Sequence, residues 1–214
     1  GHALQTGGVI VDSGKFDWTN GNYPEFTEPD ESYHGVVYTK DFGESAYIVK
    51  ARVQLMRDLG ACQSAFGAFL INQGIETLPV RMDRHCRNAE VVAEFLSKHP
   101  KVEAVSYPTL DGNPYKDLAA KYLPKGCSGV IAFTVKGGRE AGAKFIDSLK
   151  MISLLVHVAD IRTCVLHPAS STHRQLTEEQ LIAGGVAPGL IRLSVGIENV
   201  DDIIEDIEQA LAQC

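Results

Sequence analysis

Arg192 is the residue whose setting in this sequence most clearly suggests chemistry. It lies within the apolar run LIRLSVGI. An arginine in a buried strand needs an anionic partner, or it must extend its head to water. Pairing with a nearby Asp or Glu is one interpretation, and binding a ligand carboxylate through two parallel hydrogen bonds is the other. Arg162, Arg174 and His157 are weaker cases of the same ambiguity.

Other reactive residue types are present, but their spacing fits known catalytic patterns poorly. His167 and His173 flank PASST, which is not the spacing that puts two histidines on one helix face. A metal site would also need a third ligand, so this interpretation is disfavoured. The chain contains no G-x-S-x-G elbow, and its glycine pairs at 7–8 and 137–138 form neither a P-loop nor a dinucleotide fingerprint.

Composition narrows the class of protein. Of the 214 residues, 44% are apolar and 22% are charged, which is typical of a globular protein and excludes disorder throughout. The net charge of −7 disfavours a nucleic-acid binder, because such proteins carry a basic face. No apolar stretch reaches the roughly 18 residues that predict a membrane span.

The cysteines point to a reducing compartment. There are five, an odd number, and no two of them form a C-x-x-C pair. This disfavours both a disulfide framework and a zinc site, so we expect small buried hydrophobes in a cytoplasmic protein. No secretory signal is visible.

The first residues suggest that this sequence starts in the middle of a longer polypeptide. The chain lacks an initial Met and opens on GHALQTGG, followed by an apolar run at 9–11. Residues 7–12 are predicted to form a short buried strand, which needs neighbouring strands for its backbone groups. Residues 13–45 then follow without periodicity but with many aromatics. They are either a surface meander held by aromatic anchors or a loop that walls a ligand pocket.

Helical periodicity begins at Ser45. Spacings of three and four predict helices over 45–60, 64–73, stopped by Gly74, and 78–99. After these long helical segments the predicted elements become shorter. This change places a domain boundary near residue 100. Strands are predicted at 102–107, 129–135, 156–158, 163–166 and 191–195, and helices at 115–122, 139–149 and 200–212, with a capping box at Thr177 and Gln180.

Four segments together resemble the Cys/Met-metabolism family of pyridoxal-phosphate enzymes over essentially the whole chain. They are GHALQTGGVIVDSGKFDW at the start, RHCRNA at 84–89, HPASSTHRQL at 167–176 and LIRLSVGIEN at 190–199. The segments PEFTEPDESYHGVVY and ETLPVRMDRHCRNA are similar to the O-acetylhomoserine sulfhydrylase branch more than to the cystathionine lyases.

The resemblance implies a fold of type I, combining α/β and α+β parts. Residues 1–75 would end the large cofactor-binding domain, 76–99 would be a linking helix, and 100–214 would form the C-terminal domain. That domain would hold a small antiparallel or mixed sheet with helices. The resemblance also implies a homotetramer whose active sites are shared between subunits.

The implied cofactor is pyridoxal 5'-phosphate. In the family, the lysine that binds it as a Schiff base lies a few residues before the G-H that opens this chain, so we expect it to be missing here. We therefore expect the chain alone to be inactive, without this base and nucleophile. It would work beside an N-terminal half of the same enzyme, on a separate chain or lost by cleavage.

The resemblance assigns substrate-side roles to three residues. Arg192 matches the arginine that grips the substrate α-carboxylate, Thr172 matches a threonine near the substrate pocket, and His157 falls where relatives often carry Ser or Asn. The implied reaction is γ-replacement on O-acetyl-L-homoserine, in which sulfide or methanethiol displaces acetate to give homocysteine or methionine. Alternatives are a cystathionine γ-synthase, a methionine γ-lyase or a non-catalytic scaffold subunit.

Overall fold

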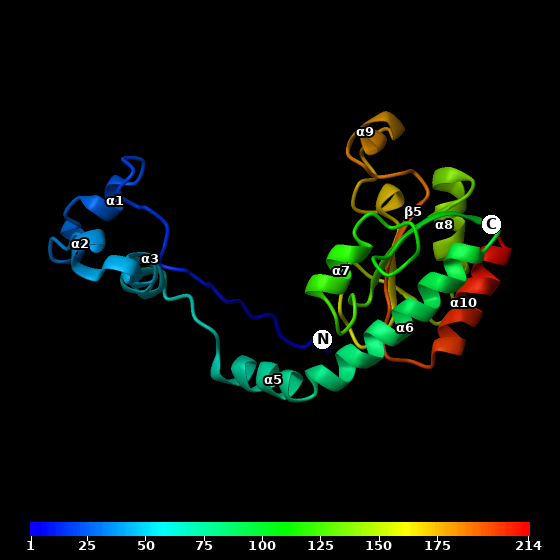
Figure 1. Ribbon diagram of the computed structural model, residues 1–214, viewed down its shortest axis with the longest axis horizontal. Coiled ribbons are helices and arrows are strands. Elements are labelled where there is room, and N and C mark those ends of the chain that lie inside the picture. The colour runs from blue at the N-terminus through cyan, green and yellow to red at the C-terminus, as the bar shows by residue number, and fades with distance from the viewer. The chain divides into compact units, whose positions relative to one another are not determined.

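The computed structural model describes all 214 residues and divides the chain into two compact units. One unit comprises residues 1–3 and 73–214, and the other comprises residues 4–72. Figure 1 shows the elements of both. None of the helices combines the length and the apolar character that a membrane span requires.

A five-stranded mixed sheet forms the centre of the unit that contains residues 73–214. The strand order is β1-β2-β5-β4-β3, in which only β3 and β4 run parallel. The strands are β1 Val102–Ser106, β2 Val130–Val135, β3 Ser153–Leu154, β4 Cys164–Leu166 and β5 Leu190–Ser194. This confirms the small mixed sheet with helices expected for a C-terminal domain. Strand β5 lies at its centre.

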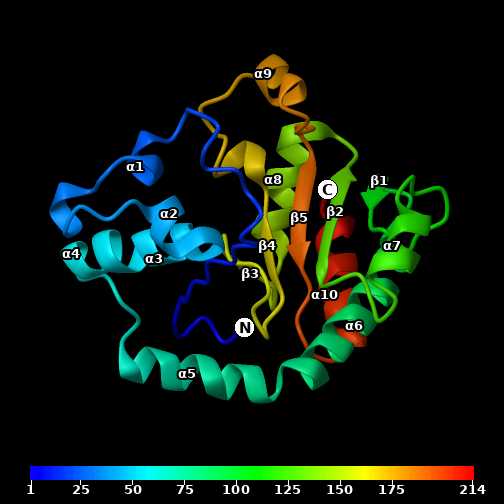
Figure 2. The same cartoon turned by 60° about the vertical axis from the view of Figure 1, so that its left-hand side comes forward.

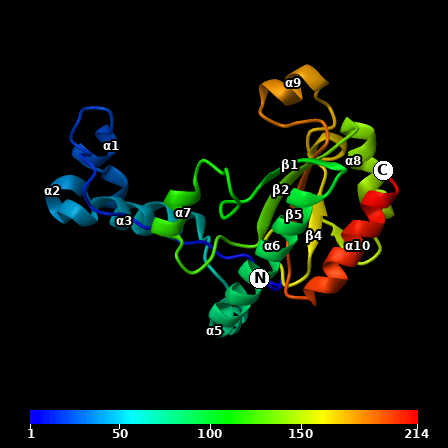
Figure 3. The same cartoon turned by 45° about the vertical axis from the view of Figure 1, so that its right-hand side comes forward.

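Three long helices pack on one face of this sheet. They are α6 Leu78–Lys98, α8 Gly138–Ser148 and α10 Val200–Ala212, and Figure 3 shows α8 and α10 together on one side of the strands. Alternation along β2 and β5 directs every second side chain toward these helices, which buries Ile131, Phe133, Ile191 and Leu193 almost completely. The other side chains of the strands therefore face away from the core.

Shorter elements connect the sheet and the helices. Gly137 and Gly138 both have positive φ, at 102° and 67°, which a side chain would strain, and they turn the chain from β2 into α8. The capping box predicted at Thr177 is present and starts α9. The remaining short elements are α7 Lys116–Tyr122, the 3-10 turn η4 Pro168–Ser170 and α9 Glu178–Ala183.

Asp206 ties α10 to the turn that follows α8. The residue is 6% exposed, and its carboxylate accepts backbone N–H bonds from Lys150, Met151 and Ile152 at 2.8–2.9 Å. Gln209 donates a further bond at 3.0 Å. Burial alone would raise the pKa of Asp206, but the three backbone donors and Gln209 outweigh it and leave that pKa below its usual range. The carboxylate is thus held ionised inside the fold.

The unit of residues 4–72 consists of short helices. They are α1 Pro24–Thr27, η1 Glu31–Tyr33, α2 Tyr38–Phe42, η2 Gly43–Ser45, α3 Ala46–Lys50, the π-helical η3 Ala51–Met56 and α4 Arg57–Leu59. The helix predicted over 45–60 is thus present, with a wider turn in its middle. Gly60 ends it in the left-handed conformation, as expected. Helix α5, Ala65–Glu76, spans the division between the units.

Aromatic side chains hold the irregular part of this unit together. The Trp18 ring stacks on Phe26 at 4.3 Å between centroids and on Tyr47 at 5.4 Å. Phe16 and Tyr23 pack against the Trp18 ring with tilted or edge geometry. These contacts support the interpretation of residues 13–45 as a meander held by aromatic anchors. A role in walling a ligand pocket stays a prediction.

Asp30 is the polar centre of the same segment. It accepts hydrogen bonds from the amide and hydroxyl of Ser32, from the Tyr38 hydroxyl at 2.9 Å and from Gln54 at 3.2 Å, and it pairs with Lys50 at 3.6 Å. Burial and the bond to Asp30 raise the pKa of Tyr38 to about 12. The one carboxylate therefore binds groups that lie as far as 24 positions from it in the chain.

Three sequence-based predictions about elements were wrong. Residues 7–12 are extended but form no strand, because no other segment pairs with their backbone, and Val9 and Val11 are exposed. Helix α5 does not stop at Gly74 but continues to Glu76. The strand predicted at 156–158 lies earlier, at β3, where the backbone pairs with β4.

The structure divides the chain at residues 72 and 73, so α6 packs with the sheet within one unit. The predicted borders, with a linking helix over 76–99 between domains of 1–75 and 100–214, stay a prediction for the complete protein.

Candidate functional site

The face of the sheet that points away from the helices carries Arg192. In the antiparallel register, Arg192 of β5 lies opposite Ala132 of β2 and Leu166 of β4. Ser194 projects from β5 on the same face, opposite Cys164 of β4. Figure 2 shows β4 and β5 side by side in the middle of the sheet. We call this surface the outer face.

Arg192 has no carboxylate partner in this chain. Its Nη2 donates a hydrogen bond to the Val156 carbonyl at 2.8 Å, and none of the ion pairs in the chain includes it. A local Asp or Glu partner, one of the two interpretations left open, is therefore contradicted. A guanidinium has five N–H donors, so most of those on Arg192 remain available to an anion. The arrangement fits a carboxylate-binding cation.

The backbone segment 156–159, called the strap here, is fastened to the outer face by three side chains. Arg192 binds the Val156 carbonyl, the Cys164 thiol donates to the His157 carbonyl at 3.3 Å, and the Ala159 N–H donates to Ser194 Oγ at 2.9 Å. The strap is therefore held by hydrogen bonds to side chains rather than by a strand ladder.

The structure brings two of the three predicted site residues into one neighbourhood. His157 lies on the strap, one position from the carbonyl that binds Arg192, and its side chain is exposed. Thr172 lies beyond η4, in the loop that follows β4, and its hydroxyl contacts only the neighbouring His173 ring at 2.9 Å. No hydrogen bond joins the side chains of Arg192, His157 and Thr172. Their substrate-binding roles stay predictions.

The loop of residues 167–176 is organised around the buried His167 ring. His167 Nε2 lies 2.8 Å from the Pro188 carbonyl, which can only accept, so this nitrogen carries the proton. Nδ1 then accepts from the Ser170 hydroxyl at 2.8 Å. The Ser171 hydroxyl donates to the His167 carbonyl at 2.6 Å. The conspicuous HPASSTH motif thus builds a hydrogen-bonded turn, with its first histidine as a structural residue.

Burial keeps the His167 ring neutral. It lowers the pKa of His167 below its usual range, the hydrogen bond with Pro188 opposes that shift, and the nearby Arg139 charge adds to it. A neutral ring can both donate to Pro188 and accept from Ser170, whereas a protonated ring could only donate. Both hydrogen bonds of the turn therefore depend on the neutral form.

Gly142 of α8 leaves the space that the His167 ring fills. A Cβ at this position would lie 2.5 Å from His167 Nε2, so Gly142→Ala should displace the ring or the helix. We expect a destabilisation of roughly 1–3 kcal/mol from overpacking. The measurement is urea unfolding of the complete protein. Gly74→Ala is the matched control, because its Cβ would meet nothing closer than 3.7 Å and alanine favours a helix. Equal stability of the two variants would contradict the expectation.

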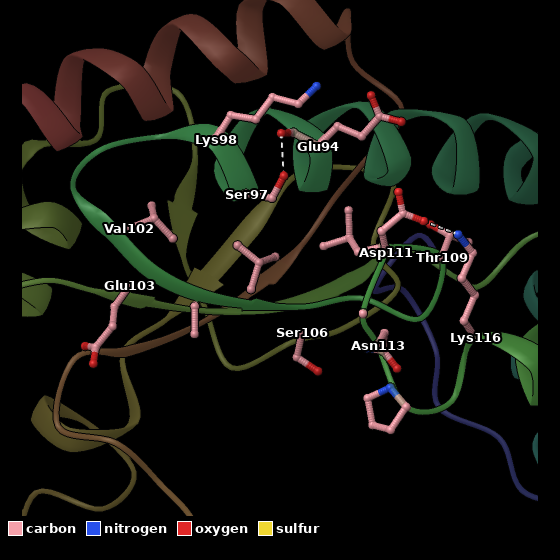
Figure 4. A pocket seen from close by; sticks show the side chains of 15 residues that line it. Glu94, Ser97, Lys98, Val102, Glu103, Ser106, Thr109, Asp111, Asn113 and Lys116 are labelled. Atoms are coloured by element: carbon pink, nitrogen blue, oxygen red, sulfur yellow. Dashed lines mark hydrogen bonds and ion pairs between the residues drawn. The ribbon is translucent and has the colours of Figure 1, made fainter.

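A large cavity lies away from these residues. It measures about 770 Å³ and is lined by the end of α6, strand β1 and the loop of residues 109–114. Figure 4 shows its charged side chains, among them Lys116 paired with Asp111 at 2.5 Å. None of the predicted site residues lines it. This cavity and the unpaired Arg192 therefore belong to different parts of the unit.

Sequence reasoning missed the residues that fasten the strap. Ser194 follows Arg192 by two positions, and strand alternation could have placed both side chains on one face. Cys164 was expected to be a small buried hydrophobe. It is indeed buried, and it also makes a hydrogen bond to the strap.

The cation without a carboxylate partner could bind an anionic ligand, and comparison with known proteins defines the family of the chain. The model of the Cys/Met metabolism PLP-dependent enzyme family matches residues 1–212. The chain belongs to this family, which confirms the resemblance stated from its motifs and the pyridoxal-phosphate dependence that the family carries.

Named relatives are similar over the whole chain. An O-acetyl-L-homoserine sulfhydrylase of Leptospira meyeri is 50% identical over 220 residues, covering 99% of this chain and 50% of the relative. A homocysteine synthase of Schizosaccharomyces pombe is 50% identical over 213 residues, with the same coverage of both chains. The chain thus spans about half the length of the curated relatives it matches.

A solved structure agrees with the fold. A putative O-acetylhomoserine (thiol)-lyase from Campylobacter jejuni superposes with a TM-score of 0.79 at 40% identity, covering 89% of this chain and 45% of the other. That crystal structure contains N'-pyridoxyl-lysine-5'-monophosphate, a lysine joined to the cofactor.

Proposed function

We propose that this chain is the substrate-side part of a pyridoxal-phosphate-dependent O-acetylhomoserine sulfhydrylase. The complete enzyme would replace the acetate of O-acetyl-L-homoserine by sulfide or methanethiol, giving homocysteine or methionine. The observation that carries the proposal is Arg192, a cation on a central strand without a carboxylate partner, in a chain 50% identical to an enzyme of that name.

Arg192 would bind the α-carboxylate of the substrate. A guanidinium and a carboxylate match in a planar fork, with two parallel hydrogen bonds that fix orientation as well as position. The bond to the Val156 carbonyl holds one terminal nitrogen of the guanidinium and restricts its rotation. Holding the carboxylate fixes the rotation about the α-carbon and so decides which bond of that carbon can break.

The residues of the outer face fit a substrate and not the covalent attachment of the cofactor. Strands β2, β4 and β5 and the strap contain one arginine, two hydroxyls, one thiol and the exposed imidazole of His157 among their outward side chains, and no lysine. Bound pyridoxal phosphate would supply the electron sink for the carbanion formed at the α-carbon. The chain's own contribution is to bind the carboxylate and to keep the strap in place beside it.

The proposal assigns the Schiff-base lysine to the half of the relatives' length that this chain does not span. The N-terminal half of the same enzyme would then be its partner, and this chain alone would be inactive. His157 and Thr172 would contact the substrate beside Arg192, in a cytoplasmic homotetramer. Light scattering of the complete protein measures the assembly.

The decisive experiment assays the complete protein, loaded with pyridoxal phosphate. O-acetyl- and O-succinyl-L-homoserine are each offered with sulfide, methanethiol and cysteine, and the amino-acid products are quantified. We expect homocysteine or methionine from the acetylated donor. Preference for the succinylated donor with cysteine would support a cystathionine γ-synthase instead.

The scaffold alternative is tested by mixing this chain with the separately produced N-terminal half. A visible absorbance band of bound cofactor together with turnover supports the enzyme. The two halves must each be folded by circular dichroism and must associate with one another. If they then show no cofactor band and no turnover, the result supports the non-catalytic scaffold.

A further inference from the structure

Arg139, at the start of α8, holds both ends of the loop that carries Thr172. Its Nη1 donates to the Ala169 carbonyl at 3.0 Å and its Nη2 donates to the Leu176 carbonyl at 3.1 Å. The two carbonyls lie on either side of Thr172 in the chain. One guanidinium therefore closes the loop by joining its two ends.

Arg139 is also free of any acidic partner. No ion pair in the chain includes it, and its side chain is half-buried. Its guanidinium binds two backbone carbonyls and no carboxylate. Its hydrogen bonds therefore hold the two carbonyls in place and do not neutralise an acidic side chain.

The surface of α8 is shaped to hold the same loop at a second point. Residues 139 and 142 lie three positions apart and share one helix face. At 142 the missing side chain admits the buried His167 ring, which the Pro188 carbonyl and the Ser170 hydroxyl fix. The loop is thus fastened at its first residue by a ring and at 169 and 176 by Arg139.

The fastened loop adjoins the strand that carries Arg192. Leu166, directly before the loop, lies opposite Arg192 in the β4–β5 register, and η4 packs against β5. Between the fastened points, the Thr172 side chain is exposed and binds only its neighbour His173. A group presented in this way is available to a ligand.

We infer that Arg139 is a positioning residue for the amino-acid substrate: it clamps the 167–176 loop so that Thr172 and the loop backbone meet the substrate bound at Arg192. The inference rests on the proposed function. Arg139 itself touches neither substrate nor cofactor in this account and acts through the two carbonyls.

The test replaces Arg139 by methionine and by lysine in the complete, cofactor-loaded protein. Arg139→Met keeps the apolar stem and removes both donors, so KM for O-acetyl-L-homoserine should rise about fivefold to thirtyfold, with kcat changed less than twofold. Arg139→Lys should recover part of the loss, since an ammonium can reach one carbonyl but lacks the fork. Arg87→Met, on the exposed surface of α6, is the control and should leave KM unchanged.

Hydrogen exchange gives a readout that does not need turnover. In Arg139→Met, amides of residues 168–176 should exchange at least about tenfold faster than in the wild type, while those of β2 keep their protection. Faster exchange throughout the unit would mean that Arg139 merely stabilises the fold and would overturn the inference. Unchanged exchange in the loop would overturn it as well.

A double-mutant cycle links the clamp to Thr172. If Arg139 acts through this residue, the effects of Arg139→Met and Thr172→Val on KM should combine to less than their product. Effects that multiply fully would contradict the inference. A wild-type enzyme that does not use O-acetyl-L-homoserine would refute the proposed function instead. The KM values of the cycle would then be measured with whichever amino-acid substrate the wild type turns over.

Discussion

Replacing Arg192 by alanine in the complete enzyme should lower kcat/KM for O-acetyl-L-homoserine at least tenfold. A hydrogen bond to a charged group contributes roughly 1.5–3 kcal/mol, which corresponds to about tenfold to 150-fold in rate. The loss should be large because no other arginine and no lysine projects from β2, β4, β5 or the strap on the outer face. Steady-state kinetics with varied donor concentration measures it.

Matched variants separate binding from folding. Arg192→Lys keeps the charge but loses the fork, so an intermediate loss is expected. Arg87→Ala removes an exposed arginine of α6 and should leave kcat/KM within twofold of wild type. Circular dichroism and the cofactor absorbance of Arg192→Ala must match the wild type. A loss below tenfold would demote Arg192 to a structural residue.

The second large effect concerns stability. Asp206→Ala should destabilise the complete protein by about 3 kcal/mol, because three backbone N–H groups lose a charged acceptor and Ile152 is buried. Asp206→Asn should lose less, since an amide oxygen can still accept. Urea unfolding measures both against Glu205→Gln, an exposed change on the same helix. Equal stability of Asp206→Ala and Glu205→Gln would refute a stabilising role for the bonds between the Asp206 carboxylate and the backbone of residues 150–152.

Acid should remove the contribution of the Asp206 carboxylate to the stability of the folded protein. The pKa of Asp206 is lower in the folded than in the unfolded protein, where it lies near its ordinary value of about 3.9. Its contribution is therefore fully present above that value and is lost as pH falls through the lower, folded pKa. The stability gap between the wild type and Asp206→Asn should be constant near neutral pH and shrink in strong acid.

Helices with a strong apolar stripe could be predicted from the sequence, whereas pairing partners could not. Helix α10 was predicted at its observed bounds because Ile203, Ile207 and Leu211 recur on one face. The run at 156–158 has strand-forming residues, but contacts from Arg192, Cys164 and Ser194 make it a strap instead. Propensity does not contain such long-range contacts.

The site was predictable in part for the same physical reasons. Arg192 stood out because a cation in an apolar strand needs an explanation. Asp206 could have been singled out for a similar reason, because it is an acid between two isoleucines of a buried stripe. No role was predicted for it. The carbonyls that Arg139 binds could not be predicted, because they are backbone groups brought together only by the folded loop.

Placing Arg192 on β5 has a consequence for redesign. A strand hydrogen-bonded along both edges opens only when the whole sheet comes apart, so the guanidinium rests on the least mobile backbone available. The strap and the Thr172 turn, by contrast, are attached chiefly through side chains. Libraries that seek new donors or nucleophiles could therefore vary these two peripheral segments, while the arginine proposed to bind the α-carboxylate keeps its backbone position at the middle of the sheet.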